Sequence, residues 1–413
     1  MTPNEIKALS RNIPLIYTLN GFWAFMIIMP VIVPFFQSRG LSMSEIYQIQ
    51  AVFGFALLLF EVPSGYISDL FGRKTSLIWA CLLHGIGYFF LVYSTDFLTI
   101  LASEIVLALA VSLMSGTDVS VIYDSQLAIG SKKAPIKMVG RKVFYLQTGE
   151  ALGGLLGGFL ILFSMNGPIV GQAIVAWLPL CVVAFIKEPP RSSLDKKAHK
   201  ENFLFVFRTL FVESKTLRLI LLTSMFYGVS TLVAVWGFQK YWQEIQIPLS
   251  YFGYLWAISN FTVAVTGRFA HKIEVMVGSS VTLVAMALLP VVGFLGVGYV
   301  DGVLGVIFCL CFQMSRGLNA VVMRDALNRR IGSELRATAN SISSLGVRGL
   351  FILIGPIFGA MMDTSGAAKS FAGLGWIYAG LFFVIVLPLL RQRREFQGAD
   401  ELRRAKKSMS QGN

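Results

Sequence analysis

Several ionisable side chains of this sequence fall inside long apolar stretches. In the first half of the chain these are Glu61, His84, Glu104, Asp118 and Glu150. A charged group within a bilayer costs roughly 2.5–3.5 kcal/mol on insertion scales, so such residues are functional candidates. Burial of a carboxylate favours its protonated form, which a proton carrier needs. We therefore predict proton-coupling roles for Asp118, Glu150 and Glu104, a bracing role at a gate for Glu61, and a structural role for His84.

The spacing of two of these acids predicts a shared surface. Glu104 and Asp118 are fourteen residues apart in one apolar run. On a continuous helix, 100° per residue places them about 40° apart on one face. They are expected to line one cavity at different depths, with Asp118 and Glu150 deeper than Glu104.

The second half of the chain offers cations instead of acids. Arg316 and Arg348 each lie about thirteen residues into an apolar run. Arginine does not deprotonate usefully, so each needs a partner. Either the two arginines face the acids as an internal ion-pair network, or they hold an anionic substrate once the acids are protonated. Asn20 and Tyr227 are further substrate-binding candidates, as a polar and an aromatic residue within apolar runs.

The elements that position these residues are predicted to be membrane-spanning helices. The chain has 413 residues, of which 55% are hydrophobic and 14% charged, whereas soluble domains run roughly 45–50% apolar and about 25% charged. A spanning helix needs about 20 mostly apolar residues. Twelve such runs are centred near Ile28, Ala56, His84, Leu107, Leu152, Ile174, Thr231, Ser259, Met286, Cys309, Gly349 and Phe382. The first run, from about Ile13 to Gln37, is too long for a secretory signal and is expected to be retained as one helix.

Charge predicts the orientation and the domain division. With the N-terminus inside, 30 of the 35 lysines and arginines fall in segments that face the cytoplasm, as the positive-inside rule requires. The net charge of +13 is thus explained by topology, without nucleic acid. The long polar stretch near the midpoint predicts an N-terminal bundle at 1–187, a cytoplasmic linker at 188–215, a C-terminal bundle at 216–392 and a cytoplasmic tail at 393–413.

The two halves match weakly at an offset of about 201 residues. The segment 116–125, GTDVSVIYDS, aligns with 317–326, GLNAVVMRDA. Shorter matches join 63–65 to 265–267 and 153–157 to 355–359. Duplicated six-helix halves are a transporter architecture, with the substrate held near the midplane between them. The sequence therefore predicts an all-α integral membrane protein with two pseudo-symmetric six-helix bundles.

The turn between the second and third runs carries the strongest motif. The segment 61–74, EVPSGYISDLFGRK, resembles the signature loop of the major facilitator superfamily. The motif residues are Gly65, Asp69, Gly72, Arg73 and Lys74, with Leu70 where a basic residue is frequent. Gly65 is expected to let its helix approach a neighbour closely, and Gly72 to allow a tight turn. The resemblance implies that Asp69 and Arg73 form a charge relay with Asp124 that latches the outward-open state, and that helices 1, 4, 7 and 10 line the cavity.

The fifth run carries a glycine stripe. Gly149, Gly153, Gly157 and Gly158 allow close backbone packing on one face, and the segment is similar to the antiporter motif of the same superfamily, with Gly154 where proline is usual. The resemblance favours export by antiport.

Together these observations predict a proton-coupled transporter that exports a small amphipathic or anionic organic molecule by alternating access. The alternative is a proton symporter that imports a nutrient or organic acid; a membrane enzyme or a non-transporting receptor is a third reading. No phosphate-cradling loop, metal-ligand cluster or activated nucleophile is visible, so we expect no enzyme activity, cofactor or metal. The four cysteines lack metal-site spacing. We expect a monomer that works with substrate, protons and lipid in a bacterial inner membrane, with both termini cytoplasmic.

Overall fold

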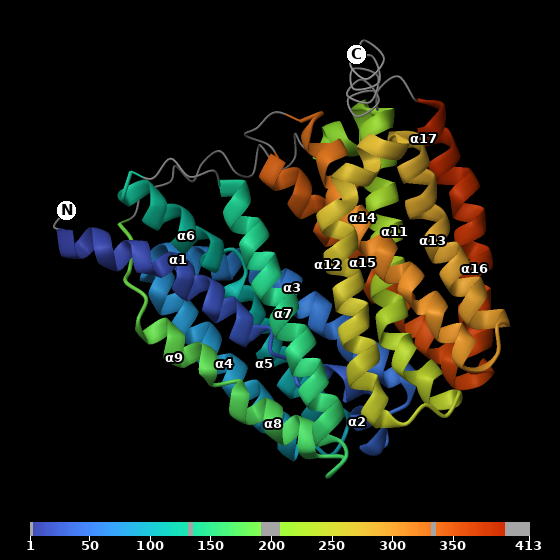
Figure 1. Cartoon of the computed structure of the whole chain (residues 1–413), viewed down its shortest axis with the longest axis horizontal. Coiled ribbons are helices and arrows are strands. Elements are labelled where there is room, and N and C mark those ends of the chain that lie inside the picture. The colour runs from blue at the N-terminus through green and yellow to red at the C-terminus, as the bar shows by residue number, and fades with distance from the viewer. Residues whose placement is uncertain (1–2, 131–134, 191–206, 332–335, 393–413) are drawn as a thin grey trace, which may run out of the picture. The chain divides into compact units, whose positions relative to one another are not determined.

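The computed structural model describes residues 3–130, 135–190, 207–331 and 336–392. These residues form helices and connecting turns, without strands (Figure 1). The predicted all-α class is therefore confirmed. The predicted tail at 393–413 and most of the predicted linker lie outside the described residues.

The chain groups into two compact units. Unit 1 comprises Met1–Leu194 with Gln246–Asn260, and unit 2 comprises Asp195–Ile245 with Phe261–Asn413. The first part of α12 (Leu249–Val277) thus groups with unit 1 and its remainder with unit 2. The boundaries predicted from the sequence did not foresee this division of one helix, and the functional domains at 1–187 and 216–392 remain a prediction.

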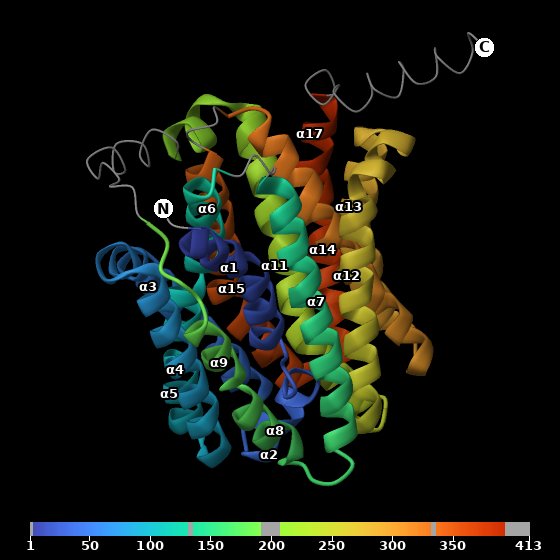
Figure 2. The same ribbon diagram turned by 60° about the vertical axis from the view of Figure 1, so that its left-hand side comes forward.

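The described part of unit 1 is built from the helices of the first six predicted runs. They are α1 (Pro3–Trp23), α2 (Ile32–Ser38), α3 (Met43–Phe71), α4 (Arg73–Tyr93), α5 (Phe97–Met114), α6 (Thr117–Ala128), α7 (Pro135–Leu160), α8 (Gly167–Val175) and α9 (Leu178–Ala184). Helix α1 packs against α6, α7 and α9, while α5 packs against α3 and α4 (Figure 2). The three helices that carry the candidate acids, α5, α6 and α7, therefore each contact other helices of this unit.

The first predicted run is not one helix. Helix α1 ends at Trp23, and a short 3-10 turn at Met29–Val31 precedes α2, so the predicted centre at Ile28 lies in the interruption. Pro30 has no N–H to continue a helical ladder. A side chain of another helix replaces one missing helical hydrogen bond in this interruption: the Ile27 N–H donates to Oε1 of buried Gln172 at 2.5 Å. The prediction of a single helix is wrong here. Hydropathy does not reveal an interruption of the helix whose free N–H group is bonded by a buried glutamine.

The fourth predicted run is also interrupted. Gly116 has φ +78°, in the left-handed region that glycine adopts readily, and it separates α5 from α6. The calculation that placed Glu104 and Asp118 on one face of a continuous helix therefore does not apply.

Helix α7 approaches its neighbours at glycines. A Cβ on Gly153 would lie 2.6 Å from the Met26 nitrogen, and one on Gly149 or Gly157 would overlap a carbonyl oxygen of the chain at Gly21 or Ile27. On another side, a Cβ on Gly158 would lie 2.7 Å from the Ser250 carbonyl oxygen of α12. Larger side chains at these positions would separate the backbones.

The described part of unit 2 holds the helices of the last six runs. They are α11 (Lys215–Glu244), the remainder of α12, α13 (Ser279–Tyr299), α14 (Gly305–Asn328), α15 (Arg336–Ser365), α16 (Ala367–Leu381), a π-helical turn (Phe382–Val386) and α17 (Leu387–Arg391). Helix α11 packs against α14 and α15, and α13 packs against α14 and α16. Buried aromatic rings join them: Phe294 and Phe312 meet edge to face with centroids 4.6 Å apart.

Nine helical spans in the described residues are long and apolar enough to cross a membrane. Helices α1, α7 and α12 fall outside this set, although each corresponds to a predicted run. These three are the helices that meet at the α7 glycines.

Candidate functional site

The signature turn is a one-residue connection between α3 and α4. Helix α3 ends at Phe71, Gly72 has φ +112°, and α4 begins at Arg73. A side chain at position 72 would strain this conformation. The turn brings the predicted relay residues together: Arg73 Nη1 lies 2.8 Å from Asp69 Oδ1, and Arg73 Nε lies 3.4 Å from Asp124 Oδ2 of α6. Arg73 thus joins three helices by two ionic contacts.

A further acid, Glu188, completes this turn. Its two carboxylate oxygens accept the backbone N–H groups of Arg73 at 2.8 Å and Lys74 at 2.7 Å. The first N–H groups of a helix have no partner within the helix, and a carboxylate there is favoured by the helix dipole. Glu188 therefore caps α4 across a large sequence separation. This role of Glu188 is not predictable from the sequence, because an acid at the start of a polar linker gives no sign of its partner.

Asn12 fixes the chain just before Glu188. Buried Asn12 donates from Nδ2 to the Lys187 carbonyl at 2.7 Å and to Ser125 Oγ at 2.9 Å, and its Oδ1 accepts from the Lys187 N–H at 2.9 Å. These contacts join α1, α6 and the end of the sixth run. Glu188 is held in place by them.

The expectation for Gly65 is wrong. A Cβ at Gly65 would meet no heavy atom within 4 Å in the described structure. No close helix approach occurs at this glycine, whereas the α7 glycines do provide one. A glycine in an apolar run indicates only that close packing is allowed.

Asp118 forms a buried ion pair. It lies in the first turn of α6, where its side chain is 1% exposed, and its Oδ2 is 2.5 Å from Nζ of Lys142 on α7. The Lys142 side chain is 19% exposed. Removing either partner leaves a charge out of water without compensation, which is strongly unfavourable. Lys142 was counted in the sequence only as a topology-determining charge of a loop, because its position inside a helix could not be read from hydropathy.

Aromatic and basic residues lie beside Lys142 along α7 and opposite them on α1. The ring of Tyr17 on α1 stacks on Tyr145 of α7 with centroids 5.5 Å apart. Tyr17 is largely buried, and its hydroxyl finds no hydrogen-bond partner in the described part of the chain. Arg141, next to Lys142, lies close enough to Tyr17 to interact with it electrostatically. The cluster of Asp118, Lys142, Tyr17 and Tyr145 is called the α6–α7 charge cluster below.

The other two candidate acids lie elsewhere in unit 1. Glu104 is buried on α5, beside Gln50 of α3 and near Tyr88 of α4. It therefore faces different helices from Asp118, and the expected common cavity of Glu104 and Asp118 is not formed. Glu150 lies half-buried on α7, directly after Gly149.

The two arginines of unit 2 differ in burial. Arg316 is exposed in the middle of α14, and among the described residues it has no ion pair or hydrogen bond. The predicted internal ion-pair network is therefore not formed by Arg316 within the described chain. Arg348 lies half-buried on α15.

The uncharged substrate candidates are both buried. Asn20 donates from Nδ2 to the Ile16 carbonyl of its own helix at 2.8 Å. Tyr227 on α11 packs edge to face against Tyr378, with centroids 5.8 Å apart, and no partner for its hydroxyl lies in the described chain. The structure does not bring Asn20 together with the α6–α7 charge cluster by any hydrogen bond.

The sequence matches the profile of the Major Facilitator Superfamily over residues 15–356. The chain belongs to this superfamily. Its members are multi-pass membrane transporters rather than enzymes, in agreement with the apolar helices and the signature turn. The resemblance stated from the signature motif is confirmed at the level of the family.

Two curated relatives carry the same family name. A Bacillus subtilis protein named as the uncharacterized MFS-type transporter YxaM is 26% identical over 263 residues, which cover 59% of this chain and 63% of the relative. A second uncharacterized MFS-type transporter, from Methanocaldococcus jannaschii, is 20% identical over 63% of this chain and 67% of its own length. The match to the Bacillus subtilis relative thus spans less than two thirds of that protein.

Solved transporter structures share the fold. A mutant of the nucleoside transporter NupG superposes with a TM-score of 0.76 at 12% identity and covers 93% of this chain and 99% of its own. A D-xylose-proton symporter superposes with a TM-score of 0.70 at 15% identity, covering 93% and 97% of the two chains. At these identities the likeness supports the twelve-helix, six-plus-six architecture and says nothing about substrate.

Proposed function

We propose that this superfamily member is a proton-coupled transporter that exports a small organic molecule with an anionic group. The observation that carries the proposal is the buried ion pair of Asp118 and Lys142. An acid held out of water by a single cationic partner has two stable arrangements: charged and paired with Lys142, or protonated and released from it. A change between these arrangements is what coupling to a proton gradient requires.

In the proposed cycle, a proton from outside the cell binds the Asp118 carboxylate and breaks its contact with Lys142. The positive charges of Lys142 and the neighbouring Arg141 on α7 are then no longer compensated by the Asp118 carboxylate. Helix α7 contacts α1 and α12 through glycines and transmits small shifts without side chains that could adapt. The cycle is completed when the proton leaves to the inside and the pair forms again.

The anionic group of the substrate is proposed to bind Arg316. An arginine in the middle of a membrane helix is expensive unless it meets a negative charge, and no acid among the described residues supplies one. A guanidinium holds a carboxylate by two parallel hydrogen bonds. Arg348, Asn20 and Tyr227 remain candidates for secondary contacts.

Orientation and setting complete the proposal. We propose that both termini lie in the cytoplasm, which the distribution of lysine and arginine supports; the signature turn at Gly72 and the cap at Glu188 would then lie on the inner face. The Arg73 contacts with Asp69 and Asp124 would hold unit 1 in one state of the cycle. We further propose a monomer in a bacterial inner membrane.

The experiment uses proteoliposomes that contain the purified protein and a pH-sensitive dye. A panel of organic anions is supplied on one side, and proton movement is recorded. Export by antiport predicts proton flux opposite to the anion, lost in Asp118→Asn and retained in the control Asp96→Asn, which changes an exposed acid. Flux in the same direction would instead establish the symport alternative, and flux that is unchanged in Asp118→Asn would refute a coupling role for the ion pair.

A further inference from the structure

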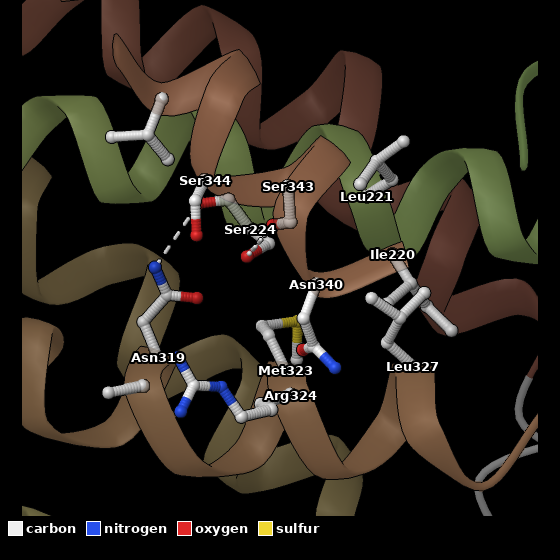
Figure 3. Close-up of a pocket in the computed structure, with 12 residues that line it drawn as sticks. Ile220, Leu221, Ser224, Asn319, Met323, Arg324, Leu327, Asn340, Ser343 and Ser344 are labelled. Carbon is white, nitrogen blue, oxygen red and sulfur yellow. Dashed lines mark hydrogen bonds between the residues drawn. The ribbon is translucent and has the colours of Figure 1, made fainter. Parts of the chain in front are cut away.

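Unit 2 contains a cavity that the transport proposal does not use. It has a volume of about 110 Å³ and is lined by α11, α14 and α15 (Figure 3). One side is apolar, with Ile220, Met323 and Leu327 among its residues. The polar lining groups are the side chains of Ser224, Asn319, Arg324, Asn340, Ser343 and Ser344.

Arg324 supplies the positive charge of this cavity. It lies eight residues beyond Arg316 on α14, about 12 Å along the helix at 1.5 Å per residue, so the two arginines belong to different places. No ion pair or hydrogen bond of Arg324 occurs among the described residues. The adjacent acid, Asp325, is engaged elsewhere, because its Oδ2 lies 2.6 Å from Nη2 of Arg329. Among the described residues, no carboxylate therefore competes for the N–H donors that the Arg324 guanidinium presents to the cavity.

Asn319 supplies an unused acceptor. Its Nδ2 donates to the Ser224 carbonyl oxygen at 3.2 Å, which fixes the orientation of the amide. Its Oδ1 is buried and has no donor in the described part of the chain. Buried acceptors of this kind are normally satisfied by protein, water or ligand. Figure 3 shows Asn319 and Arg324 on the same side of the cavity.

Ser224, Ser343 and Asn340 already form hydrogen bonds within the protein. The hydroxyls of Ser224 and Ser343 lie 3.1 Å apart and hydrogen-bond to each other. Asn340 donates to Asn328 Oδ1 and to the Arg336 carbonyl, both at 2.7 Å. Among the described residues, the unmet capacity of the cavity thus consists of the Arg324 donors, the Asn319 acceptor and the Ser344 hydroxyl.

We propose that this cavity binds the carboxylate of a small organic acid that carries an O–H or N–H donor on the neighbouring carbon. The carboxylate would pair with Arg324, and the donor would bond to Asn319 Oδ1. The class comprises α-hydroxy and α-amino acids, and the volume admits only a few heavy atoms. The inference goes beyond the proposed function, because the lining of this cavity includes Arg324 and not Arg316.

The test measures binding without a proton gradient, so that its outcome is independent of transport. The full chain in detergent is titrated by calorimetry with glycolate, glycine and acetate, of which acetate lacks the donor. Glycolate or glycine is expected to bind at least about tenfold more tightly than acetate, since a site built to bond a hydroxyl or amine discriminates against its loss. Equal binding of all three, or of none, would overturn the proposal.

Variants separate the two contacts. Arg324→Gln should weaken glycolate and acetate alike by about tenfold, while Arg329→Gln, which alters an arginine already paired with Asp325, should leave both unchanged. Asn319→Leu should abolish the preference for glycolate over acetate, with thermal melting used to verify that the variant is folded. Unchanged affinity in Arg324→Gln would contradict the site.

The binding result also distinguishes this inference from the transport proposal. If Asp118→Asn and Arg316→Gln abolish coupled flux while glycolate still binds, both proposals stand and the cavity is a separate site. If flux behaves as proposed and glycolate does not bind, only the cavity is refuted. If glycolate binds and no anion drives proton flux, the cavity stands as a binding site and the transport proposal fails.

Discussion

In unit 1 the charged side chains near α6 contact one another, whereas in unit 2 the two arginines of α14 have no ionic partner in the described chain. Asp118 pairs with Lys142, and Asp124 pairs with Arg73. Arg316 and Arg324 are both exposed. A paired charge is compensated within the protein, while an unpaired one within a membrane helix is tolerated when a ligand or water supplies the partner. The difference supports the proposal that unit 1 carries the proton-dependent switch and unit 2 the contacts with an anionic substrate.

The backbone conformation of the repeated segments also differs between unit 1 and unit 2. The matched segments at 116–125 and 317–326 begin with glycines that behave differently. Gly116 has φ +78° and ends a helix. Gly317 lies inside continuous α14, where a Cβ would sit 2.9 Å from the nitrogen of Gly267. One glycine of the repeat thus provides a break that places Asp118 in a first helical turn, and the other provides close packing.

The largest effect is expected from breaking the ion pair of unit 1. Lys142→Met leaves the Asp118 carboxylate buried without a cation, which should destabilise the fold by about 3–5 kcal/mol. The double variant Asp118→Asn with Lys142→Met removes both charges and should recover most of the loss. Thermal unfolding in detergent measures all three proteins. If the single and double variants melt at the same temperature, the two residues are not coupled.

The next effect concerns the unpaired charge of unit 2. Arg316→Gln should leave the stability within about 0.5 kcal/mol of the parent, since no contact among the described residues is lost. Anion flux in proteoliposomes should fall by at least about tenfold, because a charge-assisted contact to the substrate is removed. Arg329→Gln, at the C-cap of the same helix, serves as the control. A large loss of stability in Arg316→Gln would show that the arginine has a structural partner.

A smaller effect compares the signature turn with its counterpart in unit 2. Gly278 has φ +92° and joins α12 to α13, as Gly72 joins α3 to α4. Glu188→Ala removes the acceptor for two N–H groups of α4 and should cost about 1 kcal/mol, the usual value of a helix cap. Glu274→Ala removes the bond from Ser279 Oγ at 2.9 Å near the second turn and the contact of Glu274 Oε2 with His271 Nδ1 at 3.9 Å. Melting temperatures should fall more for Glu188→Ala, and the reverse order would contradict the capping role.

The smallest effect is pH-dependent. Asp96 caps α5 between two spans, and the Thr99 N–H that it accepts lowers the pKa of its carboxyl. A lowered pKa in the folded state contributes stability above the unfolded pKa of about 3.9, and this contribution is lost as the pH falls through the folded value. Asp96→Ala should therefore melt slightly below the parent at pH 7, with a difference that vanishes in acid. A difference that is independent of pH would show that the charge is not involved.

The positions of the helices could be predicted from the sequence because bilayer burial imposes long apolar runs. Eleven of the twelve predicted centres lie within helices. The helix interruptions near Ile28 and at Gly116 could not be predicted in this way. Hydropathy contains no information about the backbone angle φ, or about a side chain such as Gln172 that accepts a hydrogen bond from an unwound segment. Gly116 could have indicated the interruption between α5 and α6, because glycine often ends a helix, but the sequence pattern identified it only as part of the repeat.

The candidate site was predicted where partners are fixed by a short motif. Asp69, Arg73 and Asp124 come together as the signature turn implies. Lys142, Glu188 and Arg324 were missed as site residues, because each lies near the end of an apolar run and a basic or acidic residue there already satisfies the topology rule. Tertiary packing decides which of these charged side chains contact the protein interior, and no local sequence pattern predicts those contacts.

The most direct test of this division of roles compares two transport assays on Asp118→Asn and Arg316→Gln. One assay drives anion movement with a proton gradient, and the other measures exchange of labelled anion across the vesicle membrane without a gradient. We expect Asp118→Asn to lose gradient-driven transport and to retain exchange, because its defect lies in the proton step, while Arg316→Gln loses both. Loss of exchange in Asp118→Asn together with normal exchange in Arg316→Gln would contradict the account.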